Sequence, residues 1–233
     1  MTILKSGNKI LSMGGKVLRW VPPVPPVATD IKYGYLYNWY VTANIAGAGW
    51  RVPSDGDWDD LVNHLGGESV AGGKLKETGF TYWSDPNESA TNEVGFNARG
   101  GGYRSNTDGE FAGIMNFSTL WTSDNNVFFI FSSDATASTF SNTGGEAYGY
   151  CVRLIKDTTT LTNGQTGTYT GNDGKVYRTI CINNQEWLAD NLAETKYNTG
   201  ADIPEVTDNA TWAGLTTSAR CSYLNDEETY AFY

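Results

Sequence analysis

The side chains that most often carry nucleophilic catalysis are few in this chain. His64 is the only histidine, and the three cysteines are Cys151, Cys181 and Cys221. A Ser-His-Asp or Cys-His site would have to use His64, which falls on a predicted helix as a surface residue. We therefore expect no catalytic residues and no enzymatic activity. The cysteines match no zinc spacing and cannot all pair within one chain, which leaves one disulfide open.

Two acidic clusters contain the oxygen ligands that calcium needs. Their members are Asp55, Asp57, Asp59 and Asp60 in the first, and Asp85, Asn87, Glu88, Asn92 and Glu93 in the second. The first cluster lies at the start of a predicted helix, where the helix field by itself favours carboxylates. We expect no metal and no cofactor, with calcium as the alternative.

A binding surface is the chemistry that residues 121–150 favour. This stretch has few long charged side chains and many Asn, Ser, Thr, Phe and Tyr, a composition typical of antibody contact surfaces. Because strand residues alternate between two faces, we expect Phe128, Ile130, Thr136, Ser138 and Phe140, or their odd-even partners, to face outward. The full predicted ligand-binding set is Trp121, Ser123, Asn125, Asn126, Phe128, Ile130, Thr136, Ser138, Phe140, Asn142 and Tyr148.

Composition excludes several other classes of partner. The 233 residues carry a net charge of −10 with only 18% charged residues, which disfavours nucleic acid and anionic membranes. No stretch approaches the roughly 20 apolar residues that span a bilayer. The N-terminal residues lack the features of a signal peptide, so we expect synthesis in the bacterial cytoplasm. With 39% apolar and 13% aromatic residues, the chain can form a packed core.

The elements that must position the binding stretch are mixed helices and strands. Ser54 with Asp57 predicts a capped helix that Gly66-Gly67 ends, and residues 207–215 predict a second one. Residues 71–113 read mainly as loops. Strands are predicted at 127–131, 135–140 and 148–155, joined as an antiparallel meander, and at 176–182 and 185–188. The predicted class is α+β, with two short helices, small antiparallel sheets and long ordered loops.

The N-terminal residues form a separate predicted unit. Residues 1–21 read as short strands broken at Gly7-Asn8 and Gly14-Gly15, a β arm that would serve as an anchor. Residues 22–30 contain Pro22-Pro23-Val-Pro25-Pro26 and predict a stiff linker. The main domain would then occupy 31–233. The alternative is that the arm packs on this domain as an extra strand.

Several sequence motifs resemble those of one known family, the Fibrobacter succinogenes major paralogous domain. They are Tyr33-Gly-Tyr-Leu-Tyr-Asn-Trp39, Gly49-Trp-Arg-Val-Pro-Ser54, Gly95-Phe-Asn-Ala-Arg-Gly-Gly-Gly-Tyr-Arg104, Leu120-Trp-Thr-Ser123, Gly149-Tyr-Cys-Val-Arg153 and Asn184-Gln-Glu-Trp-Leu-Ala-Asp-Asn-Leu192. The family is similar to the formylglycine-generating branch of the C-type lectin-like fold. The resemblance implies that fold for 31–233.

The order of these motifs departs from the family. Its C-terminal portion resembles 33–157, whereas its N-terminal portion resembles 168–233. We interpret this as circular permutation within one chain, which domains with neighbouring termini tolerate. The alternative is that residues 160–233 complete a neighbouring subunit.

The resemblance also implies a function. Similar lectin-like proteins are phage receptor-binding proteins and targets of diversity-generating retroelements, with Asn125, Asn126 and Asn142 as candidate diversified positions. We expect a non-enzymatic virion protein of a tail fibre, tail tip or head fibre that recognises a host-surface protein or carbohydrate. Residues 1–30 would contact other virion proteins, and a homotrimer is expected. The alternatives are a bacterial cell-surface or secreted adhesin and, third, a formylglycine-generating-type oxidase that uses Cys151.

Overall fold

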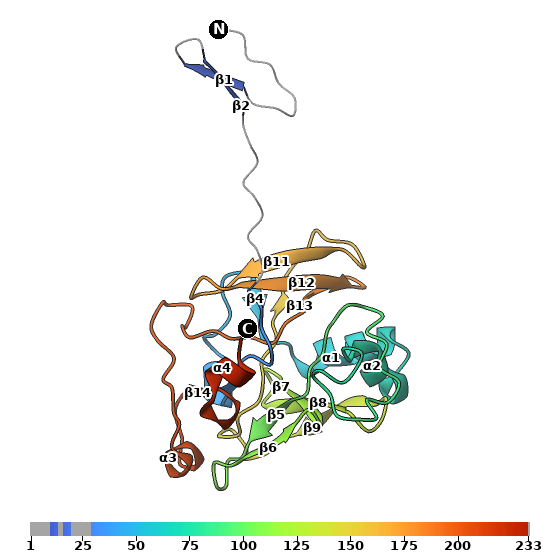
Figure 1. Ribbon diagram of the computed structural model, residues 1–233, viewed down its shortest axis with the longest axis vertical. Coiled ribbons are helices and arrows are strands. Elements are labelled where there is room, and N and C mark those ends of the chain that lie inside the picture. Colours follow the sequence, from blue (N-terminus) through green and yellow to red (C-terminus); the bar gives the residue numbers. More distant parts are fainter. Residues whose placement is uncertain (1–9, 14–15, 20–28, 233) are drawn as a thin grey trace.

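The computed structural model describes residues 10–13, 16–19 and 29–232 (Figure 1). Within these ranges the chain is α+β, with four α-helices and several small antiparallel sheets. The predicted turns at Gly7-Asn8 and Gly14-Gly15 and the proline segment 22–26 lie outside the described residues. The first two strands, β1 (Ile10–Met13) and β2 (Lys16–Arg19), pair antiparallel with each other.

The helices are α1 (Asp55–His64), α2 (Glu68–Leu75), α3 (Asn209–Ala213) and α4 (Glu227–Tyr230), with the 3-10 helices η1 (Trp39–Val41) and η2 (Tyr223–Asn225). The capping box at the start of α1 is confirmed, because Ser54 accepts from the Asp57 amide and Asp57 accepts from the Ser54 amide. The prediction of only two helices was wrong.

Helix α2 was missed because it contains Gly72 and Gly73, which have low helix propensity. Packing explains both residues. A Cβ on Gly72 would lie 2.1 Å from the Thr136 backbone oxygen, and one on Gly73 would lie 2.6 Å from the Ser89 oxygen. Close backbone approach therefore overrides the local preference.

The strands of the main domain form four sheets. They are β3 (Leu36–Tyr37), β4 (Trp50–Arg51), β5 (Gly101–Arg104), β6 (Phe111–Ile114), β7 (Phe117–Trp121), β8 (Asn126–Phe131), β9 (Ala137–Ser141), β10 (Ile155–Lys156), β11 (Thr166–Thr170), β12 (Val176–Ile182), β13 (Gln185–Leu188) and β14 (Arg220–Cys221). The orders are β11-β12-β13-β10-β4, β14-β3, β5-β6 and β7-β8-β9. The predicted strands at 176–182 and 185–188 are confirmed.

The predicted meander was wrong in its third strand. β8 and β9 pair as expected, but the third member is β7, on the other side of β8. The segment predicted as a strand at 148–155 instead runs beside β7 through a parallel bridge between Leu120 and Cys151. It then enters the five-stranded sheet as β10. The partners of this segment were predicted wrongly because they lie about 30 residues away in the sequence, at Leu120 and Trp187.

The C-terminal third of the chain packs into the same body as the preceding residues. β14 pairs with β3, and an isolated bridge joins Ile31 to Phe232. In Figure 1 the described main domain accordingly begins close to where it ends. Residues 29–156 and 157–232 therefore share their sheets and their core.

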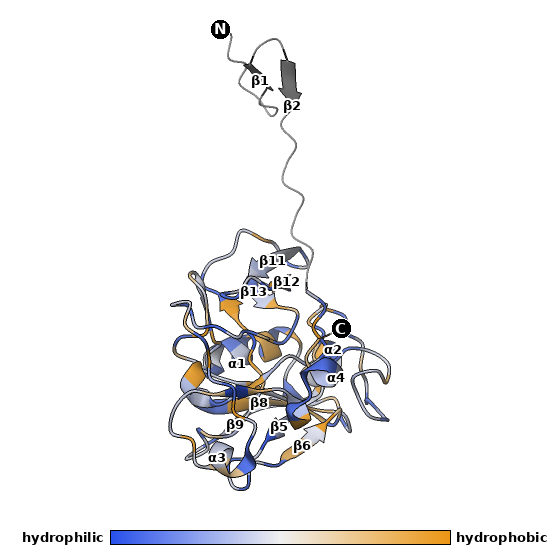
Figure 2. Ribbon diagram, turned by 60° about the vertical axis from the view of Figure 1, so that its left-hand side comes forward, coloured by the Kyte–Doolittle hydropathy of each residue, from blue (hydrophilic) through white to orange (hydrophobic). Residues whose placement is uncertain are grey.

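Two buried apolar clusters fill the domain. In the first, Trp58 of α1 stacks on Phe128 of β8, with ring centroids 4.1 Å apart and planes at 10°, and it also contacts Trp187 of β13. Figure 2 shows hydrophobic residues along β13 and around β8, whereas α4 is mostly hydrophilic. The second cluster surrounds Tyr37 and Trp121.

A buried carboxyl group lies in this second region. Glu194 is fully buried, its Oε2 accepts from the Asp173 amide at 3.1 Å, and its Oε1 has no partner among the described residues. Burial, with the nearby Asp173 carboxylate as a second cause, raises the pKa of Glu194 from 4.5 to about 7. The folded chain thus holds a proton at a pH where the unfolded chain has lost it.

The substitution Glu194→Gln should raise the free energy of unfolding above that of the wild type at pH 8. Because the pKa of Glu194 is raised by folding, its contribution to stability is lost as pH rises from about 4.5 to about 7. The neutral amide removes a penalty on the order of 3 kcal/mol at pH 8. Urea unfolding at pH 5 and pH 8 measures this effect.

The matched control is Glu228→Gln, on the exposed surface of α4. It should leave the difference between the two pH values unchanged. An equal pH dependence in wild type and Glu194→Gln would contradict the assignment.

Candidate binding site

The β7-β8-β9 sheet presents two different faces. Directly opposed residues of antiparallel strands share a face, and Phe128 opposes Leu120 on one side and Thr139 on the other. This face packs on α1, where Phe128 and Ile130 are fully buried. The opposite face carries Phe129, which opposes Thr119 and Ser138.

The predicted outward set was therefore partly wrong. Phe128 and Ile130 belong to the core, whereas Ser138 and Phe140 lie on the outer face with Phe129 and Phe131. The cause is the connection between β8 and β9. Between the last paired residues, Ile130 and Ala137, lie six residues, 131–136, and this even number makes even-numbered residues of one strand oppose odd-numbered residues of the other.

The outer face carries a row of phenylalanines that crosses all three strands. Phe140 of β9 meets Phe129 edge-on at 5.5 Å, Phe129 stacks with Phe131 at 5.6 Å, and Phe131 meets Phe117 of β7 at 5.7 Å between ring centroids. Phe140 is 46% exposed, and the other three are partly buried. Exposed apolar patches on folded proteins are frequently places where ligands or partners bind.

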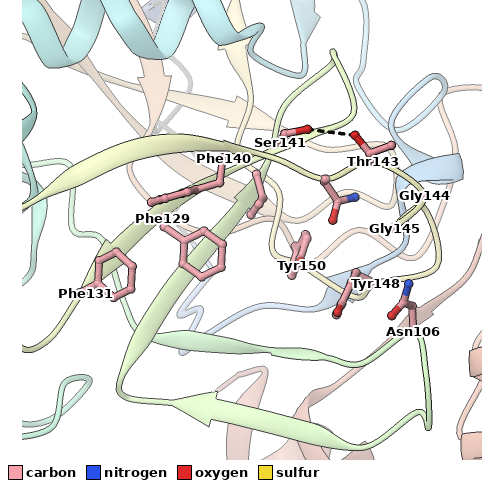
Figure 3. A pocket seen from close by; sticks show the side chains of 12 residues that line it. Asn106, Phe129, Phe131, Phe140, Ser141, Thr143, Gly144, Gly145, Tyr148 and Tyr150 are labelled. Atoms are coloured by element: carbon pink, nitrogen blue, oxygen red, sulfur yellow. Dashed lines mark hydrogen bonds between the residues drawn. The ribbon is translucent and has the colours of Figure 1, made fainter.

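A groove of about 590 Å³ opens on this face, which we call the aromatic groove (Figure 3). It is lined by Asn106, Val127, Phe129, Phe131, Phe140, Ser141, Asn142, Thr143, Gly144, Gly145, Tyr148 and Tyr150. The volume falls within the range of about 300–1,000 Å³ found for small-molecule pockets. None of the lining residues carries a charge.

Tyrosines form the second aromatic part of the groove. Tyr148 stacks on Tyr150 with centroids 5.3 Å apart and planes at 8°, and Tyr150 in turn contacts the buried Trp121 at 4.6 Å. The Trp121 indole donates to the Tyr37 backbone oxygen at 2.6 Å. Trp121, predicted as a contact residue, is thus a fixed support beneath the tyrosines.

Three asparagines hold the loop that walls the groove after β9. The Asn126 side chain donates to the Asp55 carboxylate at 2.6 Å and accepts from the Asn142 backbone N–H at 3.3 Å. Asn125 donates to the Glu146 carboxylate at 3.0 Å. Of the three, only Asn142 lines the groove, and it is largely buried. These predicted contact residues therefore include two that position the loop.

Of the remaining predicted contact residues, two line the groove and three do not. Tyr148 and Phe140 line it, while Ser123 is exposed, and Thr136 and Ser138 are partly exposed outside the lining. The predicted set lacked Asn106, which comes from the loop after β5, and also Thr143, Gly144, Gly145 and Tyr150. It included Phe129 and Phe131 only as odd-even partners. The glycine pair Gly144-Gly145 beside polar residues was the available signal for the wall of the groove.

The residues considered for catalysis or metal binding lie elsewhere. The three cysteines are free and buried, and burial raises the pKa of the thiols of Cys151 and Cys221 to about 12. His64 is exposed at the end of α1. Within the described part of the chain, no group of three or more His, Cys, Asp or Glu residues is placed to hold a metal. No helix of that part is long and apolar enough to cross a membrane.

In the first acidic cluster, Asp57 is bound within the start of α1, whereas Asp59 and Asp60 are exposed. The Asp57 carboxylate accepts from Arg51, at 2.8 Å for Nη2, and from the Ser54 amide at 2.7 Å. Although burial acts in the opposite direction, the bonds from Arg51 and Ser54 keep the pKa of Asp57 below its usual value.

Alanine substitutions on the two faces of the sheet should differ strongly in cost. Phe128→Ala removes a fully buried ring that stacks on Trp58, and should lower the free energy of unfolding by about 3–5 kcal/mol. Phe140→Ala removes a ring that is 46% exposed, and should cost about 1 kcal/mol or less. Denaturant unfolding compares the two variants, and equal costs would contradict the register.

Comparison with known proteins identifies the family. The family model described as the Fibrobacter succinogenes major domain matches residues 25–156, which is more than half of the chain. The match covers the portion bearing the groove, and residues 157–233 lie outside it. No curated protein and no solved structure matches the chain. The chain belongs to the Fibrobacter succinogenes major domain family.

Proposed function

We propose that this protein is a non-enzymatic binding module whose ligand occupies the aromatic groove. The observation that carries this proposal is the phenylalanine row on the outer face of β7-β8-β9, next to the stacked pair Tyr148 and Tyr150. Rigid aromatic rings offer contact area at low conformational cost, and the neighbouring Asn, Ser and Thr offer adaptable hydrogen bonds. These are properties of a recognition surface.

The chemistry of the remaining residues supports binding over catalysis. A nucleophilic cysteine needs a lowered pKa and access to solvent, whereas Cys151 and Cys221 are buried with raised pKa values. His64, on the exposed end of α1, has no cysteine beside it on that helix. The proposal requires no metal or other cofactor.

At the level of fold, we propose a C-type lectin-like domain in circularly permuted order. Support comes from the Ile31–Phe232 bridge, which brings the two ends of the described main domain together. The pairing of Leu36 with Cys221 and of Tyr37 with Arg220 supports it as well. Residues 33–157 and 168–233 would be the two family portions, after an arm at 1–21 and a linker at 22–30.

The permutation can be tested by restoring the family order. A variant that begins at residue 158, continues through Tyr233 and a short glycine-serine linker to residue 29, and ends at residue 157 should fold. The new break falls after Lys156 of β10, in an exposed connection at Asp157. Its thermal unfolding should be cooperative and its groove intact. Failure of this variant to fold, with the untouched chain as control, would contradict the proposal.

In its biological setting, we propose a phage virion protein of a tail fibre, tail tip or head fibre. The groove would bind a protein or carbohydrate on the host surface, and residues 1–30 would join other virion proteins, in a homotrimer. The strand pair β1-β2 ahead of the main domain supports a separate attachment element. The low content of charged residues is consistent with a surface-recognition role.

Two readouts test this function. Antibodies against the chain should label purified phage particles, and deletion of residues 1–28, which leaves Thr29 bound to the Val176 backbone, should abolish the labelling.

The second readout is cell binding: the full-length protein carrying a fluorescent dye should bind susceptible bacterial cells in flow cytometry. Phe140→Ala combined with Tyr148→Ala should lower that binding at least tenfold. Phe80→Ala, at a ring that is 59% exposed and lies outside the groove, is the matched control. Unchanged cell binding by the double variant would contradict the assignment of the groove.

A further inference from the structure

We propose that the ligand of the aromatic groove is an uncharged saccharide of more than one sugar ring. This inference rests on the proposed binding function and specifies its ligand class. The first argument is electrostatic. All twelve lining residues are uncharged, although the chain has a net charge of −10. A charged ligand would lose hydration in the groove without a counter-charge to offset it.

The second argument is the shape of the aromatic surface. The groove offers two adjoining platforms, one made of Phe129 stacked with Phe131 and flanked edge-on by Phe140, and the other of Tyr148 stacked on the buried Tyr150. They meet where the Phe129 and Tyr150 centroids are 6.5 Å apart. A pyranose has an apolar face of C–H groups that packs on an aromatic ring, while its hydroxyls point sideways. Two adjoining platforms suit two linked rings.

The third argument is the polar rim. Figure 3 shows Ser141, Thr143, Asn106 and Tyr148 around the aromatic rings. The Ser141 and Thr143 hydroxyls are 3.1 Å apart, so one donates to the other and both keep further bonding capacity. The side-chain oxygen of Asn106 accepts from the Thr107 hydroxyl at 3.2 Å, and its nitrogen and the Tyr148 hydroxyl are donors that can face a ligand. Groups that both donate and accept match sugar hydroxyls, which do the same.

The size of the groove favours an oligosaccharide over a folded protein. A specific protein interface buries about 800 Å² on each partner, and would extend beyond these twelve residues onto charged surface. The groove volume of about 590 Å³ instead suits a ligand of drug-like size. A small ligand can therefore contact all of the residues that line the groove.

The experiment uses the full-length protein on an array of neutral di-, tri- and tetrasaccharides, together with their sialylated and uronic-acid counterparts. Neutral members should bind and the acidic counterparts should bind more weakly. For the best neutral member, isothermal titration should show that Phe140→Ala weakens binding several-fold to about tenfold. Tyr148→Phe, which keeps the ring and loses the hydroxyl, should weaken it less than Tyr148→Ala. Phe80→Ala should bind like wild type.

Saturation-transfer NMR gives an independent readout. Irradiation of aromatic protons should transfer to sugar C–H protons, and Phe140→Ala should reduce that transfer. Binding restricted to acidic saccharides, or saccharide binding that survives Phe140→Ala and Tyr148→Ala, would overturn the proposal. Cell binding that depends on the groove but is abolished by protease and not by periodate would overturn the saccharide and leave the binding function standing.

Discussion

Two buried guanidinium groups hold the two parts of this chain together. Arg153 is fully buried and donates to the Asn97, Leu188 and Phe96 backbone oxygens and to the Asn191 side chain, at 2.8 Å for Asn97 and 3.1 Å for Leu188. Burial lowers the pKa of Arg153 to about 9. Since a buried cation without partners costs several kcal/mol, these oxygens must stay in place.

Arg104 is likewise fully buried and needs partners for its charge. It donates to the Val206 and Thr207 backbone oxygens at 2.7 and 2.8 Å, and its guanidinium lies 4.5 Å from the centre of the Trp212 ring. Each arginine thus comes from the family-matched portion and binds oxygens of the C-terminal portion. The same scaffold fixes the groove, because Thr119 of β7 donates to the Gly102 oxygen of β5 at 2.6 Å.

Local signals in the sequence were enough for some elements and not for others. The capping box at Ser54 and the hairpin of β12 and β13 depend on residues close in sequence, and both were predictable. Helix α2 was not, because its glycines are explained only by backbone at Thr136 and Ser89. The region of the candidate site was predicted, but which of its side chains face the groove depends on the register between β8 and β9, which the connection between these strands sets. Asn106 reaches the groove from the loop after β5, which no periodicity reveals.

Strand β8 has consequences for how this protein can change over evolutionary time. Its residues Phe128 and Ile130 fill the core, whereas Phe129 and Phe131 face the groove. Substitutions at Phe129 and Phe131 would change the surface that the groove offers to the proposed ligand, while Phe128 and Ile130 keep the interior intact. A length change of one residue between Phe131 and Ala137 would instead exchange the faces of β9 and bring Phe140 into the interior. The surface of the groove can therefore be changed by side-chain replacement on a backbone of constant length.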